Sequence, residues 1–186
     1  MSQYKLIIYP ITTSDITIDS AALVAALTTG ALIIDDVTHN YYPTGRQFLS
    51  LFSFLGCAPN ISLSPEDGNN FCHVIITPYH PELRCLGHTA SAIPRCPHCK
   101  KKLPQWQQIP GWQHGTTSCL CNQCNSSTFM RNLNWKREAA YGCMAVEIIN
   151  IHPFEAVPSE NLLALLQAAT HVEWDYCYAE HKPHSD

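Results

Sequence analysis

Hydrophobic residues in the N-terminal third of the chain form short runs separated by polar or turn-forming residues. The run from Tyr4 to Tyr9 predicts a strand that ends at Pro10. Farther along, apolar residues recur with the spacing of one helix face, i, i+3, i+4 and i+7. The elements predicted in this third are a helix over 21–29 capped by Asp19 or Ser20 with Gly30 after its last turn, a short buried strand over 31–34, and a helix over 48–55 that ends at Gly56.

The same alternation of elements returns toward the C-terminus. Apolar runs predict strands over 71–76, 143–151 and 174–178, and Ser159 is placed to cap a helix that extends to about Ala169. Because strands and helices alternate on both sides of a long central segment without such a pattern, we predict an α+β protein. Its expected body is a two-layer α/β sandwich.

Composition narrows the class of protein. The chain has 186 residues, of which 46% are hydrophobic and 14% charged, and its formal net charge is −4. Such a composition excludes a charge-driven disordered protein and a uniformly basic nucleic-acid coat. The N-terminus does not have the pattern of a secretory signal, and no apolar stretch reaches the ~20 residues of a membrane span. We therefore expect a cytoplasmic protein without a membrane partner.

Charge is distributed unevenly along the chain. Residues 83–137 contain no acidic residue and carry a formal charge of +8, whereas the remainder carries −12. Within it, residues 93–137 hold three of the four tryptophans and five of the ten cysteines. These coincidences predict a separate structural unit over 93–137, inserted into a discontinuous body formed by 1–92 and 138–186.

Two C-x2-C pairs give this segment its candidate chemistry. Cys96 and Cys99 form the first pair, and Cys121 and Cys124 form the second. A tight turn across each pair lets two thiolates hold one side of a tetrahedral ion, so two such turns complete a Zn(Cys)4 site. In the reducing cytosol, thiols bind metal more readily than they form disulfides. We therefore predict one structural Zn²⁺.

The segment around these cysteines resembles a zinc ribbon, a small three-stranded unit with a metal-binding turn at one end. In this resemblance the four cysteines are the metal ligands, and the flanking runs 116–121 and 128–135 are strands. Zinc ribbons commonly have Gly after each C-x2-C pair, whereas this chain has Lys100 and Asn125. The spacing also allows other metal ligands. Cys119 could replace Cys121, and the nearby histidines His98 and His114 are further candidates.

A different interpretation concerns redox chemistry. The sequence Cys96-Pro-His-Cys99 resembles the dithiol motif of thioredoxin-like thiol oxidases, in which a helix N-terminus lowers the pKa of the first cysteine. Such a motif should follow a buried strand and open a helix, and neither flank fits that description. This is the least favoured function. The remaining cysteines, which have no partner spacing, are Cys57, Cys72, Cys85, Cys143 and Cys177.

A closed four-thiolate site has no open coordination position, so it stabilises a fold and does not activate water. We expect an interaction or adaptor protein that binds a protein partner. The first alternative is a nucleic-acid-binding protein, whose anion-binding surface would consist of Arg95, Lys100, Lys101, Lys102, Arg131, Lys136, Arg137, Trp106 and Trp112. The second alternative is an enzyme whose site lies in the body and includes Asp35, Asp36 or Glu147, although the sequence itself shows no catalytic motif.

Overall fold

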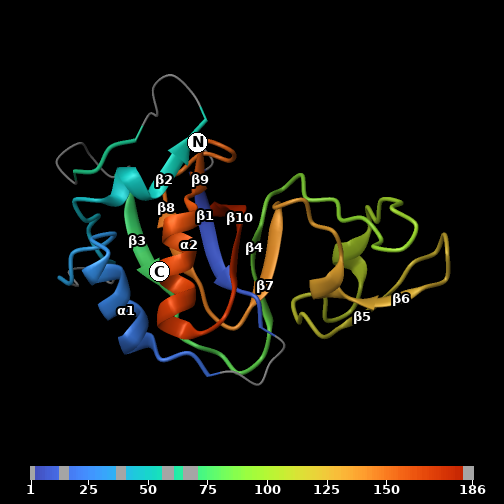
Figure 1. The fold of residues 1–186 in the computed structure, drawn as a ribbon. Helices are drawn as coiled ribbons and strands as arrows, with labels where there is room; N and C mark the ends of the chain where they lie inside the picture. The colour runs from blue at the N-terminus through green and yellow to red at the C-terminus, as the bar shows by residue number, and fades with distance from the viewer. Residues whose placement is uncertain (1–2, 13–16, 37–40, 56–60, 65–70, 182–186) are drawn as a thin grey trace, which may run out of the picture.

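The computed structural model describes residues 3–12, 17–36, 41–55, 61–64 and 71–181. This part of the chain is a mixed α+β structure, which confirms the predicted class (Figure 1). Three short 3-10 helices are η1 (Phe48–Leu51), η3 (Trp106–Gln108) and η4 (Met130–Asn132). The main elements are β1 (Gln3–Pro10), α1 (Ser20–Thr29), β2 (Phe52–Phe54), β3 (His73–Ile76), β4 (Arg84–His88), β5 (Ser118–Leu120), β6 (Ser127–Phe129), β7 (Ala139–Gly142), β8 (Val146–Ile149), β9 (Ala156–Pro158), α2 (Glu160–Thr170) and β10 (Trp174–His181).

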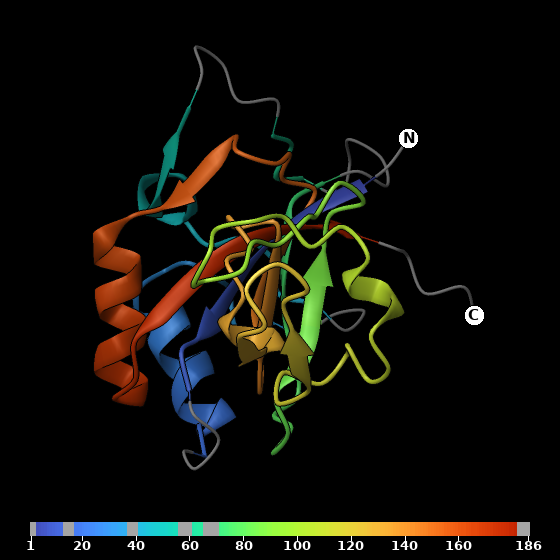
Figure 2. The same cartoon turned by 90° about the vertical axis from the view of Figure 1, so that its right-hand side faces the viewer.

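A four-stranded antiparallel sheet in the order β10-β1-β8-β3 forms the centre of the fold. Alternate residues of β1 point to opposite faces of this sheet. Leu6 and Ile8 pack with residues of α1 and α2, whereas Ile7 packs with Ala140 of β7 and Cys177 of β10. Both faces are therefore covered, which explains why this strand has a continuous apolar run in place of an alternating one. Figure 2 shows the helices on one side of the sheet.

Both helices begin at the predicted caps. The Asp19 carboxylate accepts the Ala21 N–H, and the Ser159 hydroxyl accepts the Leu162 N–H. The end of α1 differs from the prediction, because Gly30 has φ −70° and the left-handed residue is Ala31, with φ 54°. Glycine is needed at position 30 for another reason, since a Cβ there would lie 2.7 Å from the Leu165 Cδ1 of α2.

Two predicted elements are wrong. The helix expected over 48–55 is the 3-10 helix η1 followed at once by β2, which pairs antiparallel with β9. Phe48 and Phe52 are buried, as the periodicity indicated, but Leu55 is exposed. The strand expected over 31–34 is reduced to one isolated bridge between Ile33 and Thr44. The predicted helix end at Gly56 lies outside the described residues.

The strands β4 and β7, absent from the prediction, pair with each other on the face of the sheet opposite the helices. A Cβ at Gly87 would lie 2.8 Å from the Ala179 Cβ and 2.9 Å from the Ile7 Cδ1, so glycine permits β4 to cross close to the sheet. Between these two strands lies the cysteine segment, the name used below for residues 93–137. The described residues outside it are called the body.

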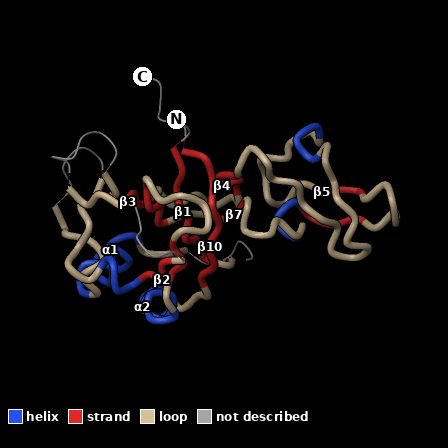
Figure 3. The backbone as a smooth tube through the Cα atoms, turned by 90° about the horizontal axis from the view of Figure 1, so that it is seen from above, coloured by secondary structure: helices blue, strands red, loops and turns tan. Residues whose placement is uncertain are grey.

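The cysteine segment extends away from the helices, and most of it is loop (Figures 1 and 3). Its hairpin β5–β6 is shorter than predicted, because β6 ends at Phe129 and η4 follows. A second core contains Trp106 and Trp135, whose rings meet edge to face at a centroid distance of 4.8 Å. Their indole N–H groups donate to the carbonyl oxygens of Ala92 and Met130. No helix of the described ranges has the length and apolar character needed to cross a membrane.

Candidate metal centre and the cleft beside the cysteine segment

The four predicted cysteines converge at one point. Their sulfur atoms all lie within 4.8 Å of one another, with separations of 3.7 Å between Cys96 and Cys124 and 3.6 Å between Cys99 and Cys121. A tetrahedral ion with Zn–S bonds of about 2.3 Å places its sulfurs about 3.8 Å apart, so the donor set fits such an ion. A disulfide requires about 2.05 Å, and none of the described cysteines forms one.

Each C-x2-C pair lies in the same kind of turn. The Lys100 N–H donates to the Cys96 carbonyl at 3.0 Å, and the Asn125 N–H donates to the Cys121 carbonyl at 2.8 Å. Lys100 and Asn125 are left-handed, with φ of 61° and 55°. These are the two positions where zinc ribbons commonly have glycine, so the turn keeps its left-handed conformation without glycine.

The alternative donors lie outside the cluster. Cys119 is buried in the core that contains Trp106 and Trp135, on the opposite face of β5 from its neighbours Ser118 and Leu120. His98 is exposed, and the Nδ1 atom of His114 lies 3.7 Å from a carboxylate oxygen of Glu82. Of Cys119 and Cys121, the two candidates that the sequence allowed, Cys121 is therefore the one that belongs to the cluster.

The first cysteine pair does not have the setting of a redox dithiol. It lies in a turn, and no helix begins between Cys96 and Lys102. Each of its sulfurs approaches a cysteine of the second pair, as the distances above show. Of the other cysteines, Cys72, Cys143 and Cys177 are buried and Cys85 is half-buried, whereas Cys57 lies outside the described residues.

The thiols of Cys99 and Cys124 differ in acidity. Hydrogen bonds from the side chain and backbone of Ser126 lower the pKa of Cys124 to about 6, which makes it a thiolate at neutral pH. The Lys101 backbone N–H lowers the pKa of Cys99, but desolvation and the three neighbouring thiols outweigh it and raise that pKa to about 11. A bound divalent cation favours thiolate at every ligand, so metal binding would release the remaining protons.

The basic residues of the predicted anion surface are dispersed. Arg95 donates to the Lys100 carbonyl and the Lys100 ammonium donates to the Pro97 carbonyl, so both lie on the first cysteine turn. Lys101 and Lys102 are exposed beside that turn. Trp106 is only 3% exposed, and its ring is not available to stack on a base. Trp112, which is half-buried, packs edge to face against Trp106.

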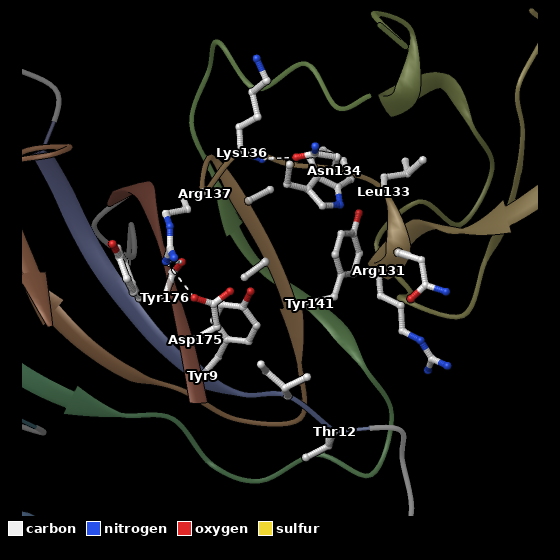
Figure 4. A pocket seen from close by; sticks show the side chains of 15 residues that line it. Tyr9, Thr12, Arg131, Leu133, Asn134, Lys136, Arg137, Tyr141, Asp175 and Tyr176 are labelled. Carbon is white, nitrogen blue, oxygen red and sulfur yellow. Dashed lines mark hydrogen bonds and ion pairs between the residues drawn. The ribbon is translucent and has the colours of Figure 1, made fainter. Parts of the chain in front are cut away.

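The other three cations, Arg131, Lys136 and Arg137, line a cleft of about 670 Å³ where the cysteine segment meets the body (Figure 4). The Arg137 Nη1 donates to the Asp175 carboxylate at 2.8 Å, and its guanidinium carbon lies 3.7 Å from the centroid of the Tyr176 ring. These cations belong to the anion surface predicted from the sequence, whereas the body residues of the cleft were not predicted. Tyr9 and Asp175 come from β1 and β10, and no local motif connects them to Arg137.

A second cavity, of about 440 Å³, contains the Lys5–Glu147 ion pair on the sheet face opposite the helices. The Lys5 Nζ lies 2.7 Å from Glu147 Oε1, and the two side chains are 14% and 9% exposed. Glu147 was one of the three acids considered for an enzyme site, and the other two, Asp35 and Asp36, are exposed and do not line this cavity. No local pattern in the chain indicates Lys5 as its partner.

Comparison with known proteins adds no family, because no family model, curated protein sequence or solved structure matches this chain. Its function is therefore argued from its own residues.

Proposed function

We propose that this protein is a zinc-dependent protein-interaction module of the cytoplasm. One Zn²⁺ held by Cys96, Cys99, Cys121 and Cys124 would stabilise the cysteine segment as a zinc ribbon inserted into a two-layer α/β body. The convergence of four sulfur atoms within 4.8 Å carries this proposal. Zinc favours thiolate ligands in tetrahedral geometry, and a reducing compartment would keep them available.

The partner surface in this proposal is the exposed face of the β5–β6 hairpin that carries Leu120 and Phe129. The strand register places Ser118 opposite Phe129 and Leu120 opposite Ser127, so Leu120 and Phe129 lie on the same face. These two apolar side chains are 59% and 43% exposed. Large exposed apolar side chains that cluster are typical of protein-binding surfaces.

A hollow of about 430 Å³ continues from Leu120 into the cysteine segment. Its apolar lining includes Leu103 and Ile109, and Lys102 contributes a cation. Because residues 83–137 contain no acidic residue, an acidic partner would meet no repulsion there. The expected ligand is therefore a peptide segment with a large apolar side chain flanked by Asp or Glu.

The metal part of the proposal is tested by elemental analysis of the purified chain. We expect about one zinc per chain, lost in Cys96→Ser and in Cys121→Ser. Cys119→Ser is the matched control, because it removes a buried sulfur from the same hairpin without removing a ligand. Zinc retained by Cys121→Ser and lost by Cys119→Ser would contradict the proposed ligand set.

The interaction part is tested by selecting peptides from a displayed random library on the zinc-loaded chain. Selected acidic–apolar peptides should lose at least tenfold in affinity with Leu120→Asp, because a charge replaces an apolar contact and repels the acids. Lys136→Gln, which lies away from the hairpin, should change affinity less than twofold. The nucleic-acid alternative would instead be supported if no peptide bound and a single-stranded oligonucleotide did, with an affinity that falls steeply as salt is raised.

A further inference from the structure

The wall of the 670 Å³ cleft contains two consecutive left-handed residues. Lys136 has φ 51° and Arg137 has φ 64°, although neither is Gly or Asn. The conformation costs roughly 1 kcal/mol or more for each residue with a Cβ, and such strain is concentrated at ligand sites. Two contacts hold it, since the Asn134 side chain accepts the Lys136 N–H and the Arg137 carbonyl accepts the Tyr178 N–H.

The strained backbone presents a fixed guanidinium group with unused donors. Both hydrogen bonds of Arg137 come from Nη1, one to the Asp175 carboxylate and one to the Tyr176 carbonyl. A guanidinium has five N–H donors, so the three on Nη2 and Nε have no hydrogen-bond partner among the described residues. The Tyr176 ring under the guanidinium and the Asp175 carboxylate restrict its rotation. Such an arrangement suits the recognition of a second anionic group.

The charge of the cleft also favours an anion. Arg131, Lys136 and Arg137 contribute three positive charges, and Asp175 is the single carboxylate among the lining residues. Arg131 comes from the wall across the opening from the Arg137–Asp175 pair, and its guanidinium lies over the Phe129 ring, 5.4 Å from the centroid (Figure 4). The Lys136 side chain points away from that pair. The uncharged polar lining includes the amides of Asn132 and Asn134 and the hydroxyl groups of Thr12, Tyr9 and Tyr141.

The volume of about 670 Å³ is within the range of small-molecule sites. We propose that this cleft binds a small organic anion, whose phosphate or carboxylate group contacts the unused N–H donors of Arg137. The rest of the molecule would extend toward Tyr141 and Arg131 on the opposite wall. This site lies beside the peptide surface proposed on the β5–β6 hairpin, because the guanidinium carbon of Arg131 is 5.4 Å from the centroid of the Phe129 ring. Arg137 is not part of that surface, so the Arg137 variants distinguish failure of one proposal from failure of the other.

Isothermal titration of the zinc-loaded full chain at low salt tests the proposal. The probes are adenosine monophosphate, inorganic phosphate, citrate and a twelve-nucleotide single strand. We expect one-to-one binding of adenosine monophosphate or citrate, and the probe that binds distinguishes phosphate from carboxylate recognition. Arg137→Gln should weaken binding at least about tenfold because it removes charge-assisted hydrogen bonds. Arg137→Lys should lose several-fold, because it keeps the charge but not the planar group.

Two further variants keep the proposal falsifiable if the Arg137 variants do not fold. Arg131→Gln changes the opposite wall and should weaken binding about threefold or more. Lys101→Gln removes the same charge from the first cysteine turn and should change affinity less than twofold. If Lys101→Gln weakened binding as much as Arg131→Gln does, the proposal that the cleft is the binding site would be wrong. Binding would then depend on diffuse charge attraction. Binding of none of the three small probes at millimolar concentration would overturn the proposal as well, whether or not the oligonucleotide binds.

Discussion

The body packs a continuous sheet-and-helix core, whereas the cysteine segment has a small core around two tryptophan rings and a cluster of thiols. In the body, Leu6 and Ile8 of β1 meet Leu162 and Leu166 of α2 with exposures of 0%. The second core has eight buried residues, of which five belong to the cysteine segment, two of them tryptophans, and the other three are Ala92, Ala139 and Tyr141. A unit this small buries too little apolar surface to be stable alone, so we expect metal ligands to supply much of its stability.

Removal of the proposed zinc should have the largest effect, and that effect should be confined to the cysteine segment. Structural zinc sites contribute about 10–16 kcal/mol of binding free energy, which is also folding free energy for the segment around them. After chelation, the turn amides of Lys100 and Asn125 should exchange as in an unfolded chain, while those of Ile7 and Ile148 stay protected. Hydrogen exchange followed by mass spectrometry checks this outcome. Equal loss of protection in the sheet would mean that the two regions fold as one unit.

The Lys5–Glu147 ion pair lies in the body. Its loss should therefore destabilise the body and leave the metal site of the cysteine segment unchanged. Glu147→Gln should lower the free energy of unfolding by about 3–5 kcal/mol, since it leaves the Lys5 ammonium buried without its counter-charge. Chemical denaturation measures the loss, and zinc content should not change. Asp175→Asn breaks a more exposed pair with Arg137 and should cost less than about 1 kcal/mol. Similar losses for both variants would contradict the difference in burial.

These two regions also differ in how far local sequence predicts them. The two C-x2-C turns were predictable because four ligands with short spacings need only local backbone geometry. The helix expected over 48–55 is not formed, although its apolar positions 48 and 52 are buried as predicted. Phe52 pairs with Pro158 in β9, and a partner this distant leaves no local pattern. A pattern of buried positions cannot distinguish a helix from a 3-10 turn that runs into a strand.

The connecting strands β4 and β7 gave no recognisable pattern. Ala139, Ala140 and Gly142 are all buried, but their small side chains carry little apolar signal. Their strand state depends on pairing with β4, more than fifty positions earlier in the chain. The cleft was unpredictable for the same reason, because Tyr9, Arg137 and Asp175 meet only after the sheet has formed.

Gly45 permits a smaller test within the body. A Cβ at this position would contact the carbonyl oxygen of Ala31, which is part of the backbone and cannot turn aside. The Gly45 N–H also donates to the Leu32 carbonyl, so the two segments cannot separate without losing that bond. Gly45→Ala should therefore destabilise the body by about 1–3 kcal/mol. Thermal unfolding measures this loss, and Gly111→Ala, in the cysteine segment, should leave the unfolding of the body unchanged.

The smallest expected effect lies in the first cysteine turn. Lys100 is left-handed with φ 61°, and glycine adopts that conformation without the penalty of a Cβ. Lys100→Gly gives up the exposed hydrogen bond from its ammonium to the Pro97 carbonyl, which offsets part of the gain. We expect a net stabilisation of about 0.5 kcal/mol, seen as slower loss of zinc to a chelator. The matched change Lys101→Gly lies at a position without positive φ and should not slow that loss. Faster zinc release from Lys100→Gly than from the parent chain would show that the ammonium contact outweighs the backbone strain in this turn.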